Sequence, residues 1–426
     1  MSVKNCTKNV LSSRYLSPFN HIFPAIVFLT VMLFIFAMCN KSSIKSSSTP
    51  VGKWVGTWST APQLVEPRNN PPSPGLSNNT IRQVVHISIG GERLRVRFSN
   101  EFSKTPVQMK SVHIALSDGS DTIKQNTDKA LTFDGEPAAI IEPGVTITSD
   151  PLNFTLEPLT NVSITIYFGE TAPDVTGHPG SRTTSYLLTG NTVSAANFPN
   201  AVRTDHWYII NGIDVLAPET SAAVAVMGNS ITDGRGSGTN KQNRWPDELA
   251  RRLQDDPETK KVAVLNMGIG GNCVLRPCLG PSAIDRFDRD VLKQHGVRWL
   301  IILEGINDIG QTGPNNADEV AVNLIAAFDR MINDAHAGGI LVYGATLLPF
   351  GDSFYDADYR EAARQKVNEW IRNSGKFDAV IDLDTALRSQ ENPLRLLPEA
   401  DCGDHLHPSE RGHRMMAEAV NLSLFK

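Results

Sequence analysis

The chain has 426 residues, of which 40 % are hydrophobic and 20 % charged, and its 40 Lys and Arg against 45 Asp and Glu leave a formal net charge of −5. This length and composition exclude a small single module and a disordered or fibrous chain, and they predict two domains with ample cores. Because there is no basic excess, nucleic acid is not expected as a partner. Five cysteines are too few for a disulfide scaffold and do not form zinc-ligand pairs, so we expect no metal and no organic cofactor.

The first 50 residues are expected to be a targeting segment and linker rather than part of the fold. Residues 22–38 form an uncharged apolar run, IFPAIVFLTVMLFIFAM, which follows Lys4, Lys8 and Arg14, and this charge order is typical of an export signal. Two alternatives remain open: cleavage before Cys39 with lipidation of its thiol, although the preceding FAM fits a bacterial lipobox poorly, or an uncleaved signal anchor. Both predict an exported, extracytoplasmic protein that is tethered to a membrane or secreted.

Residues 51–205 have the pattern of an all-β sandwich. Apolar residues alternate with polar ones in two runs on either side of Gly90 and Gly91, which predicts a β-hairpin with one buried face. The apolar positions are Val85, Ile87, Ile89, Leu94, Val96 and Phe98. Arg93, Arg95 and Arg97 fall on the opposite face, which we expect to be solvated. The alternation returns over residues 162–168, and no long run of helical period interrupts it.

Residues 206–426 change to short apolar strands separated by helical stretches. The five strand candidates read AAVAVMG, KKVAVLNMG, VRWLIILEG, GILVYGATL and AVIDL. Strands that are apolar on both faces and are separated by helices predict a parallel sheet in an α/β domain. In such a sheet, ligands bind at the carboxyl ends of the strands.

The block NSITDG follows the first of these strands, and its Ser230 is the candidate nucleophile. The plainer interpretation is that a serine at this turn caps the next helix. The block also differs from the GxSxG nucleophile elbow, because Thr232 stands in the place of the second glycine. Ser230 therefore needs support from the rest of the sequence.

That support comes from the segment CGDHLHPSERGH near the C-terminus, where Asp404 lies three residues before His407. A serine hydroxyl needs a base with a pKa near ~6.5, and the base needs an acceptor that fixes its tautomer. Asp404 and His407 can supply both groups from one loop. His405 is the competing candidate for the base.

The second and third strands end in NMGIGGN and LEGINDIG, which bring Gly271 and Asn307 to the same edge of the sheet as Ser230. Acyl transfer develops an oxyanion, and each donor preset for it contributes roughly 3–4 kcal/mol. The backbone N–H groups of Ser230 and Gly271 and the side-chain amide of Asn307 are the expected oxyanion hole. A tight turn at Gly271 and an Asx turn at Asn307 are the structural alternatives.

The blocks GNSITDG, NMGIGGN, EGINDIG and DHLHP, in this order, resemble the four signature blocks of the GDSL/SGNH hydrolases over about half of the chain. The resemblance implies Ser230 as nucleophile and oxyanion donor, Gly271 and Asn307 as the other donors, His407 as base and Asp404 as its orienting carboxylate. It also implies a three-layer α/β/α, flavodoxin-like fold with five parallel strands. The implied activity is that of a serine esterase working through an acyl-enzyme.

One position departs from this family, which usually has Asp before the serine where this chain has Asn229. An amide can accept the same hydrogen bond but carries no charge, so we expect the support of the Ser230 loop to differ. The stretch from WVGTWSTAP to SYLLTG, together with GPSAIDRFDRDVL, is similar to a branch of the family with an N-terminal β domain that includes xylan-cluster acetylesterases. That branch implies an acetyl ester on a plant polysaccharide, such as xylan, as the substrate.

Two other functions remain open at this point. The same residues could serve a lipase or arylesterase that acts on apolar esters. In a second alternative the chain is a surface-anchored, non-catalytic glycan-binding protein. This alternative remains open because Asn229 departs from the family's usual aspartate. The acyl length, the oligomeric state and the role of the β domain are not predicted.

Three cysteines lie close to the candidate site in sequence: Cys273 and Cys278 follow Gly271, and Cys402 precedes Asp404. In an oxidising compartment, a disulfide could tie the glycine loop or join it to the histidine loop. The spacing leaves three alternatives open, namely a Cys273–Cys278 bridge, a Cys278–Cys402 bridge, or three free thiols.

Overall fold

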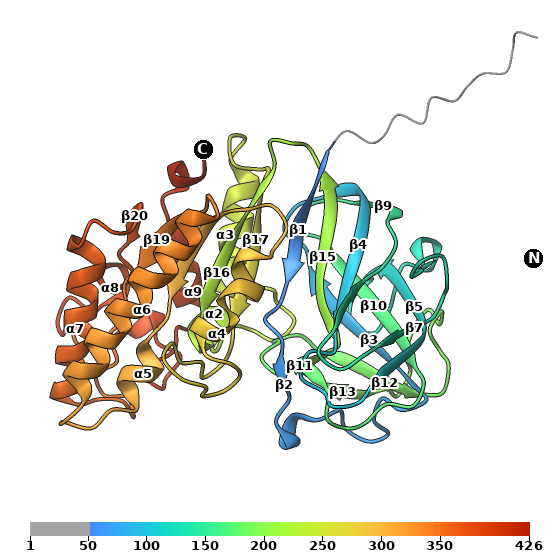
Figure 1. Ribbon diagram of the computed structural model, residues 1–426, viewed down its shortest axis with the longest axis horizontal. Coiled ribbons are helices and arrows are strands. Elements are labelled where there is room, and N and C mark those ends of the chain that lie inside the picture. The colour runs from blue at the N-terminus through green and yellow to red at the C-terminus, as the bar shows by residue number, and fades with distance from the viewer. Residues whose placement is uncertain (1–51) are drawn as a thin grey trace, which may run out of the picture. The chain divides into compact units, whose positions relative to one another are not determined.

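The computed structural model describes residues 52–426 and contains antiparallel sheets in its N-terminal part and a parallel sheet with helices in its C-terminal part (Figure 1). Residues 51–426 cluster as one compact unit. The apolar run 22–38 and Cys39 lie outside the described residues, so the predictions made for them are not tested. Within the described part of the chain, no helix combines the length and the apolar character needed to cross a membrane.

Two antiparallel sheets make up most of the N-terminal part. The first has the order β1–β15–β4–β8, with β9 also paired to β4. Its strands are β1 (Lys53–Ser59), β4 (Gly91–Ser99), β8 (Thr146–Thr148), β9 (Leu152–Leu156) and β15 (Ile210–Ala217). The second has the order β13–β12–β3–β10–β5–β6, with β7 paired to β5. Its strands are β3 (Asn79–His86), β5 (Val107–Leu116), β6 (Lys129–Ala130), β7 (Ala139–Ile141), β10 (Asn161–Phe168), β12 (Ser185–Thr189) and β13 (Val202–Thr204).

The apolar faces of these two sheets share one core, as the alternating sequence pattern requires. Leu94 and Phe98 of the first sheet and Ile81 and Ile164 of the second all belong to it and are fully buried. The predicted all-β sandwich is therefore confirmed. A small third sheet, in the order β14–β11–β2, adjoins it; its strands are β2 (Gln63–Leu64), β11 (Thr176–His178) and β14 (Trp207–Tyr208), and two short helices, η1 (Pro67–Asn69) and η2 (Gln125–Thr127), lie in the connections.

The predicted hairpin around Gly90 and Gly91 is wrong. The strand before it, β3, pairs with β10 and β12 in the second sheet, whereas the strand after it, β4, pairs with β15 in the first. The chain therefore crosses from one sheet to the other at this point. The alternating pattern identified both strands, but it could not show which partner each strand has, because the two sheets bury their faces with the same period.

The arginine face of β4 is also not solvated as expected. Arg97 is only 6 % exposed, and its guanidinium donates to Gln294 Oε1 at 2.7 Å. Arg95 Nε lies 3.0 Å from Asp214 Oδ2, and His295 Nδ1 contacts the same carboxylate oxygen at 3.0 Å. Gln294 and His295 belong to the C-terminal part, so this face of the sandwich is the surface on which the α/β part packs.

The predicted domain boundary between residues 205 and 206 has to move. β15 pairs with both β1 and β4 and so completes the sandwich, and the parallel sheet begins only at Ala222. The β part therefore ends at Ala217. The local sequence does not assign β15 to the sandwich, because its partners β1 and β4 lie far earlier in the chain.

The C-terminal part contains a five-stranded sheet in which all strands are parallel, in the order β17–β16–β18–β19–β20. Its strands match the five predicted runs: β16 (Ala222–Gly228), β17 (Val262–Gly268), β18 (Val297–Leu303), β19 (Leu341–Ala345) and β20 (Ala379–Ile381). The flanking helices are α2 (Ser230–Asp233), α3 (Trp245–Asp255), α4 (Ala283–Phe287), η3 (Asp288–Leu292), α5 (Ile306–Gly310), α6 (Ala317–Ala337), α7 (Asp358–Asn373), α8 (Leu383–Leu387), η4 (Pro398–Ala400), α9 (Glu410–Glu418) and η5 (Leu422–Phe425). The predicted three-layer α/β/α fold is confirmed.

The strand order fixes where a site can form. The connection after β16 leads to β17 at one edge of the sheet, and the next connection leads back past β16 to β18 on its other side. The direction of the chain across the sheet therefore reverses beside β16. The carboxyl ends of β16, β17 and β18 surround this switch point, which is where ligands bind in open α/β sheets. Ser230, Gly271 and Asn307 all follow these strand ends within a few residues.

Candidate active site

Ser230 is the first residue of α2, directly after β16. The cap of this helix is Asn229, whose side-chain oxygen accepts a hydrogen bond from the Ile231 N–H at 3.1 Å. The interpretation of Ser230 as a helix cap is therefore wrong, and its hydroxyl is free for another partner. Its Oγ lies 2.8 Å from Nε2 of His407, which is hydrogen-bonding distance.

His407 is held from its other side by Asp404. The Nδ1 atom lies 2.7 Å from Asp404 Oδ2, and Asp404 Oδ1 accepts the backbone N–H of His407 at 2.8 Å. Because Nδ1 donates its proton to the carboxylate, Nε2 is left to accept a proton from Ser230. The competing base, His405, is exposed and pairs instead with Asp401, with 2.6 Å between Nδ1 and Oδ2.

The environment lowers the pKa of both members of this pair. Burial lowers the pKa of His407 below its ordinary value, since the imidazolium is poorly solvated there; Asp404 opposes this effect, and Arg235 and Arg182 add to it. Burial alone would raise the pKa of Asp404, but hydrogen bonds from the His407 backbone and ring outweigh it and lower the pKa to about 2. At neutral pH the histidine is thus neutral and the carboxylate ionised.

The expected oxyanion donors stand beside this chain of hydrogen bonds. Ser230, Gly271 and Asn307 line the same cavity as His407. In the described part of the chain, the backbone N–H groups of Ser230 and Gly271 donate to no other acceptor. Gly271 has a φ of 72°, a left-handed conformation that glycine adopts without strain, and a side chain there would meet Leu279.

Two neighbours fix the orientation of the Asn307 amide. Its Nδ2 donates to the backbone oxygen of Asn272 at 2.7 Å, and its Oδ1 accepts the hydroxyl of Tyr355 at 3.0 Å. One N–H of the amide therefore remains available to the cavity. Preset donors of this kind stabilise a developing oxyanion because they need no reorganisation during the reaction.

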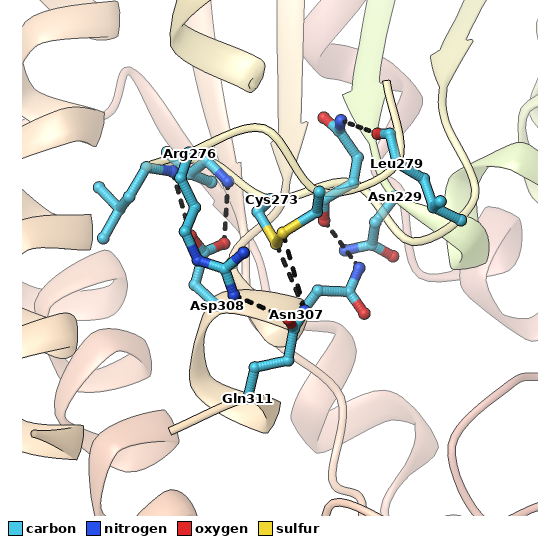
Figure 2. The surroundings of a disulfide bond; sticks show 12 residues. Asn229, Cys273, Arg276, Leu279, Asn307, Asp308 and Gln311 are labelled. Carbon is cyan, nitrogen blue, oxygen red and sulfur yellow. Dashed lines mark hydrogen bonds between the residues drawn. A yellow bond between two sulfur atoms is a disulfide. The ribbon is translucent and has the colours of Figure 1, made fainter. Parts of the chain in front are cut away.

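A disulfide joins Cys273 and Cys278 in the loop that follows Gly271, while Cys402 is free and exposed (Figure 2). This resolves the three alternatives in favour of the local bridge. Asp308, the residue after Asn307, accepts the backbone N–H of Val274 at 2.8 Å. The loop carrying Gly271 is thus tied to the helix carrying Asn307, so two of the oxyanion donors share one rigid support.

Asn229 also contacts a buried acid that underlies the Ser230 turn. Its Nδ2 donates to Glu304 Oε2 at 3.3 Å, and the other oxygen of Glu304 lies 3.3 Å from Nη2 of Arg286. Burial raises the pKa of Glu304, although Arg286 acts in the opposite direction. Where the family usually has an aspartate, this chain has Asn229, whose amide donates a hydrogen bond to the buried side chain of Glu304.

The cavity over Ser230 has a volume of about 440 Å³ and draws its lining from both parts of the chain. The α/β part contributes four of the predicted residues, Ser230, Gly271, Asn307 and His407, together with Asp233, Arg235, Gly270, Leu279, Phe354, Tyr355 and Leu406. The β part contributes Gln63, Glu66, Arg68, Asn69, Pro179, Gly180 and Arg182. The sandwich therefore forms one wall of the candidate active site.

Sequence reasoning missed this wall, and it missed Tyr355. Asn272 and Asp308 lie inside the motif blocks NMGIGGN and EGINDIG and could have been found there as hydrogen-bonding neighbours. Tyr355 lies in a stretch without strand or helix and without a motif, so no sequence signal marks it. Arg68 and Arg182 are separated from the motifs along the chain and meet them only through the packing of the two parts.

One group of possible metal ligands lies next to the histidine loop. Donor atoms of Asp401, Cys402 and Asp404 are within 4.8 Å of one another. Asp404 is already engaged by His407, and Asp401 by His405. We therefore assign no metal to this group.

No curated protein matches the chain in sequence. Solved structures that are similar to part of the chain include an acetylxylan esterase from Geobacillus stearothermophilus, with 22 % identity over 47 % of this chain and 93 % of that chain and a TM-score of 0.37. They also include a GDSL-like lipase from Bacteroides thetaiotaomicron, with 18 % identity over 47 % of this chain and 87 % of that chain and a TM-score of 0.33. Residues 226–415 match the GDSL-like Lipase/Acylhydrolase family, so the C-terminal half of the chain contains a domain of this family.

Proposed function

We propose that the protein is a serine esterase that hydrolyses carboxylic esters through an acyl-enzyme. The observation that supports this most directly is the continuous hydrogen-bonded chain from Ser230 Oγ through His407 to Asp404, with separations of 2.8 and 2.7 Å. In this proposal Ser230 is the nucleophile, His407 the general base and Asp404 the carboxylate that orients the base. The oxyanion donors are the N–H groups of Ser230 and Gly271 and the amide of Asn307.

The proposed reaction proceeds in two steps. His407 Nε2 takes the proton of Ser230 as Oγ attacks the ester carbonyl, and the three donors stabilise the negative oxygen that forms. The carbonyl re-forms as the bond to the alcohol breaks, and His407 gives its proton to the departing alcohol oxygen. Water then attacks the acyl-enzyme with the same proton transfers, which releases the acid and restores Ser230.

We further propose an acetyl ester on a plant polysaccharide, such as xylan, as the substrate. The resemblance of the N-terminal sequence to the branch that contains xylan-cluster acetylesterases supports this assignment. So does the lining of the cavity, where Gln63, Glu66 and Asn69 offer hydrogen-bonding groups to a hydroxylated ligand. A cavity of about 440 Å³ also lies within the range of small-molecule sites.

An apolar hollow favours the second candidate, a lipase or arylesterase that takes a longer acyl chain. This hollow of about 420 Å³ is lined by Leu64, Val65, Phe102 and Pro277, and it shares Leu279 and Glu66 with the lining of the catalytic cavity. A series of esters with acyl chains of two to twelve carbons distinguishes the candidates. A rate that is highest for acetyl supports the acetylesterase, and one that rises with chain length supports the lipase.

We also propose that the protein acts outside the cytoplasm, tethered by its N-terminal segment or released from it. The charge order of residues 4–38 and the Cys273–Cys278 disulfide support this location, because such bridges persist in oxidising compartments. Mass measurement of the mature N-terminus tests the form of the tether. An intact Met1 excludes the lipid anchor at Cys39.

Hydrolysis of a small chromogenic acetyl ester tests the esterase itself. We expect Ser230→Ala to abolish turnover and leave the thermal unfolding midpoint within a few degrees of the parent chain. Ser194→Ala, at an exposed position of the β part, serves as the matched control and should leave the rate unchanged. Equal rates for the parent chain and Ser230→Ala would contradict the proposal and favour the non-catalytic glycan-binding alternative.

A further inference from the structure

Three arginines line the catalytic cavity without a partner. They are Arg68 and Arg182 from the β part and Arg235 from the loop after α2. Within residues 52–426, none of the three guanidinium groups is within salt-bridge distance of a carboxylate, and the Nε atom of Arg182 is buried without any hydrogen-bond acceptor. A buried guanidinium nitrogen without an acceptor is costly, so Arg182 calls for an acceptor from outside the chain. Arg68 and Arg235 are exposed, and their guanidinium groups are free to bind the same acceptor.

Other arginines close to the site are paired. Arg244 Nε lies 2.6 Å from Asp247 Oδ2, Arg286 Nη1 lies 3.0 Å from Asp290 Oδ2, and Arg289 Nη1 lies 2.8 Å from Glu101 Oε1. These ion pairs hold the framework around the cavity. The three unpaired arginines differ from them in facing the space where the substrate would bind.

The acidic residues of the cavity do not cancel these charges. Glu66 accepts hydrogen bonds from Gln63 and Asn69, both at 2.9 Å, and not from an arginine. Asp233 faces His178, whose Nε2 lies 2.8 Å from Asp233 Oδ1 and whose Nδ1 lies 2.9 Å from the carbonyl oxygen of Ala61. Both ring nitrogens of His178 thus face oxygen atoms, and Asp233 is engaged by His178 and not by an arginine. Neither of these two acids therefore pairs with one of the three arginines.

Two of the arginines, Arg182 and Arg235, lie on the side of the site where the alcohol would leave. Arg182 and Arg235 are near enough to His407 to contribute to the lowering of its pKa, and His407 is the group that would protonate the departing oxygen. The carbonyl oxygen would point the other way, toward Gly271 and Asn307. A negative group on the alcohol part of an ester would therefore approach the guanidinium groups, whereas one on the acyl part would not.

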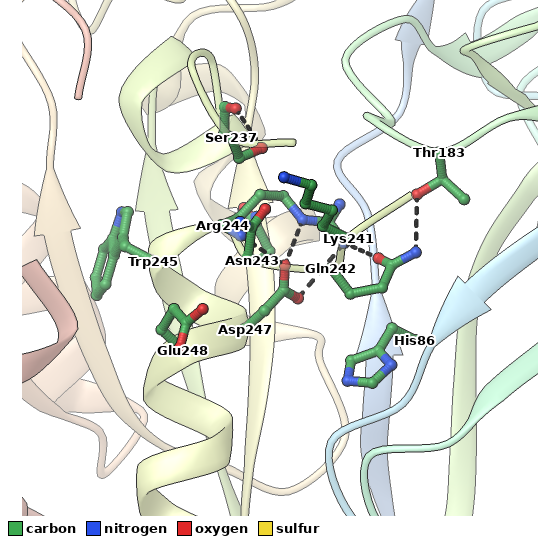
Figure 3. A network of polar contacts seen from close by, with 12 residues as sticks. His86, Thr183, Ser237, Lys241, Gln242, Asn243, Arg244, Trp245, Asp247 and Glu248 are labelled. Atoms are coloured by element: carbon green, nitrogen blue, oxygen red, sulfur yellow. Dashed lines mark hydrogen bonds and ion pairs between the residues drawn. The ribbon is translucent and has the colours of Figure 1, made fainter. Parts of the chain in front are cut away.

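The backbone around Arg182 is held in place by the α/β part. Arg182 has a φ of 51°, which is rare outside glycine, and its carbonyl oxygen accepts the N–H of Asn240 at 2.9 Å. The adjacent Ser181 oxygen accepts Nη1 of Arg244 at 3.1 Å. Figure 3 shows the neighbouring contacts of Arg244, which donates to Gln242 at 2.8 Å, while Gln242 in turn donates to Thr183. Such fixation of an unfavourable conformation indicates a positioned side chain.

We propose that the cavity recognises an ester whose alcohol part carries a negatively charged group, which Arg68, Arg182 and Arg235 bind. This inference rests on the esterase function proposed above and names a substrate class for it. Guanidinium groups bind carboxylates and other oxyanions through paired N–H donors, and the binding strengthens where water is partly excluded. An acetylated sugar unit that bears a carboxylate or a sulfate near the ester has the required chemistry.

Three synthetic esters of equal shape test this on the full chain: 4-acetoxybenzoate, 4-acetoxybenzenesulfonate and the neutral 4-acetoxybenzamide. Each kcat/KM is divided by the ester's own hydroxide-catalysed rate, which removes differences in intrinsic reactivity. We expect at least one anionic ester to exceed the neutral one by about tenfold at low salt, and the ratio to fall as salt screens the charges. The two anionic arms show whether a carboxylate or a sulfonate-like group is preferred.

Variants identify the residues responsible. Arg182→Gln and Arg235→Gln should each reduce the ratio of anionic to neutral kcat/KM at least threefold. Arg298→Gln, at the amino end of β18 and thus at the opposite edge of the sheet, should leave both the ratio and the activity unchanged. A ratio of one or less, or a ratio that both cavity variants leave intact, overturns the inference while Ser230-dependent hydrolysis of the neutral ester still supports the esterase. Absence of hydrolysis for all three esters contradicts the esterase itself.

Discussion

His178 and Asp233 form a buried pair that joins the sandwich to the helix of the candidate nucleophile. His178 ends β11 and Asp233 ends α2, and their side chains are 5 % and 2 % exposed with 2.8 Å between Nε2 and Oδ1. Because α2 begins at Ser230, this contact ties the position of Ser230 to the β part. The sandwich is thus a structural element of the site and not a separate appendage.

Substitution of His178 should therefore affect both stability and turnover. Breaking a buried pair by removing one partner leaves an uncompensated charge, which costs roughly 3–5 kcal/mol. We expect His178→Ala to lose about this much unfolding free energy in urea titrations, and the double variant His178→Ala/Asp233→Asn to lose less than the single one. We also expect His178→Ala to lower kcat for a chromogenic ester, because the contact with Asp233 holds α2 and therefore Ser230 in position.

The His113–Asp128 pair provides the matched control. It has a similar separation, 2.9 Å, but lies in the sandwich, between His113 of β5 and Asp128, the residue before β6. His113→Ala should lower stability and leave kcat unchanged. Equal losses of kcat in the two histidine variants would show that His178 acts only through global stability.

Restoring the family's usual aspartate at position 229 should destabilise this chain. Asn229→Asp removes a donor to Glu304 and places a second carboxyl group beside it, and a lost hydrogen bond costs roughly 0.5–1.5 kcal/mol. The pKa of Glu304 is already raised by burial, and a like charge would raise it further. A group with a raised folded-state pKa contributes stability at low pH that is lost as pH rises through that pKa.

Urea unfolding at pH 6 and pH 9 measures this difference. The loss for Asn229→Asp should be larger at pH 9, where both carboxyl groups must ionise. Asn421→Asp is the control. Asn421 also caps a helix, since its side-chain oxygen accepts the Ser423 N–H, but Asn421 is exposed. A loss that is the same at the two pH values would contradict the proposed coupling to Glu304.

Activity should decline at acidic pH with an inflection below 6.5. The neutral form of His407 is the competent one, and burial together with Arg235 and Arg182 lowers its pKa. Removing a positive neighbour favours the imidazolium, so Arg182→Gln should move the inflection of kcat/KM upward. The pH profile of a neutral ester measures this, with Arg298→Gln as the unchanged control. An inflection above 6.5 in the parent chain would contradict the assignment.

Motifs that follow strand ends were predictable from the sequence, and contacts between distant segments were not. Ser230, Gly271 and Asn307 each follow a separate apolar strand, so parallel topology alone brings them to one edge. Asp404 and His407 share a single tight loop, so their contact is local. The strand alternation likewise identified the sandwich but could not assign β3 and β4 to different sheets, because pairing partners are set by long-range packing.

The wall of the cavity shows the same limit. Arg68 and Arg182 lie in connections of the β part, and nothing in the local sequence of either indicates that the α/β part packs against it. Charged residues on alternate positions usually face water, so the sequence predicts a solvated face for the arginines of β4. Arg97 is instead buried by Gln294, nearly two hundred positions later in the chain. Sequence pattern predicts that a face is polar, but only packing decides what covers it.

Tyr355 should contribute to kcat through the Asn307 amide. Tyr355→Phe removes the hydroxyl that donates to Asn307 Oδ1 at 3.0 Å, and a hydrogen bond of this kind contributes about 1 kcal/mol. We expect a roughly fivefold loss of kcat with little change in KM, because the amide would act on the oxyanion and not on the bound ester. Tyr359→Phe is the control. A change confined to KM would assign Tyr355 to substrate binding instead.

The Cys273–Cys278 bridge should support both stability and turnover. It closes a short loop with a sequence separation of 5, for which the chain-entropy model gives about 2 kcal/mol. The same loop carries Gly271 and is tied to Asp308, so opening the bridge should loosen one oxyanion donor. We expect Cys273→Ser/Cys278→Ser to lower both the unfolding free energy and kcat, and a thiol reductant to reproduce the effect in the parent chain. Cys402→Ser should leave the response to reductant unchanged, since Cys402 is free. Three titratable thiols among these positions in the unreduced, denatured protein would contradict the bridge.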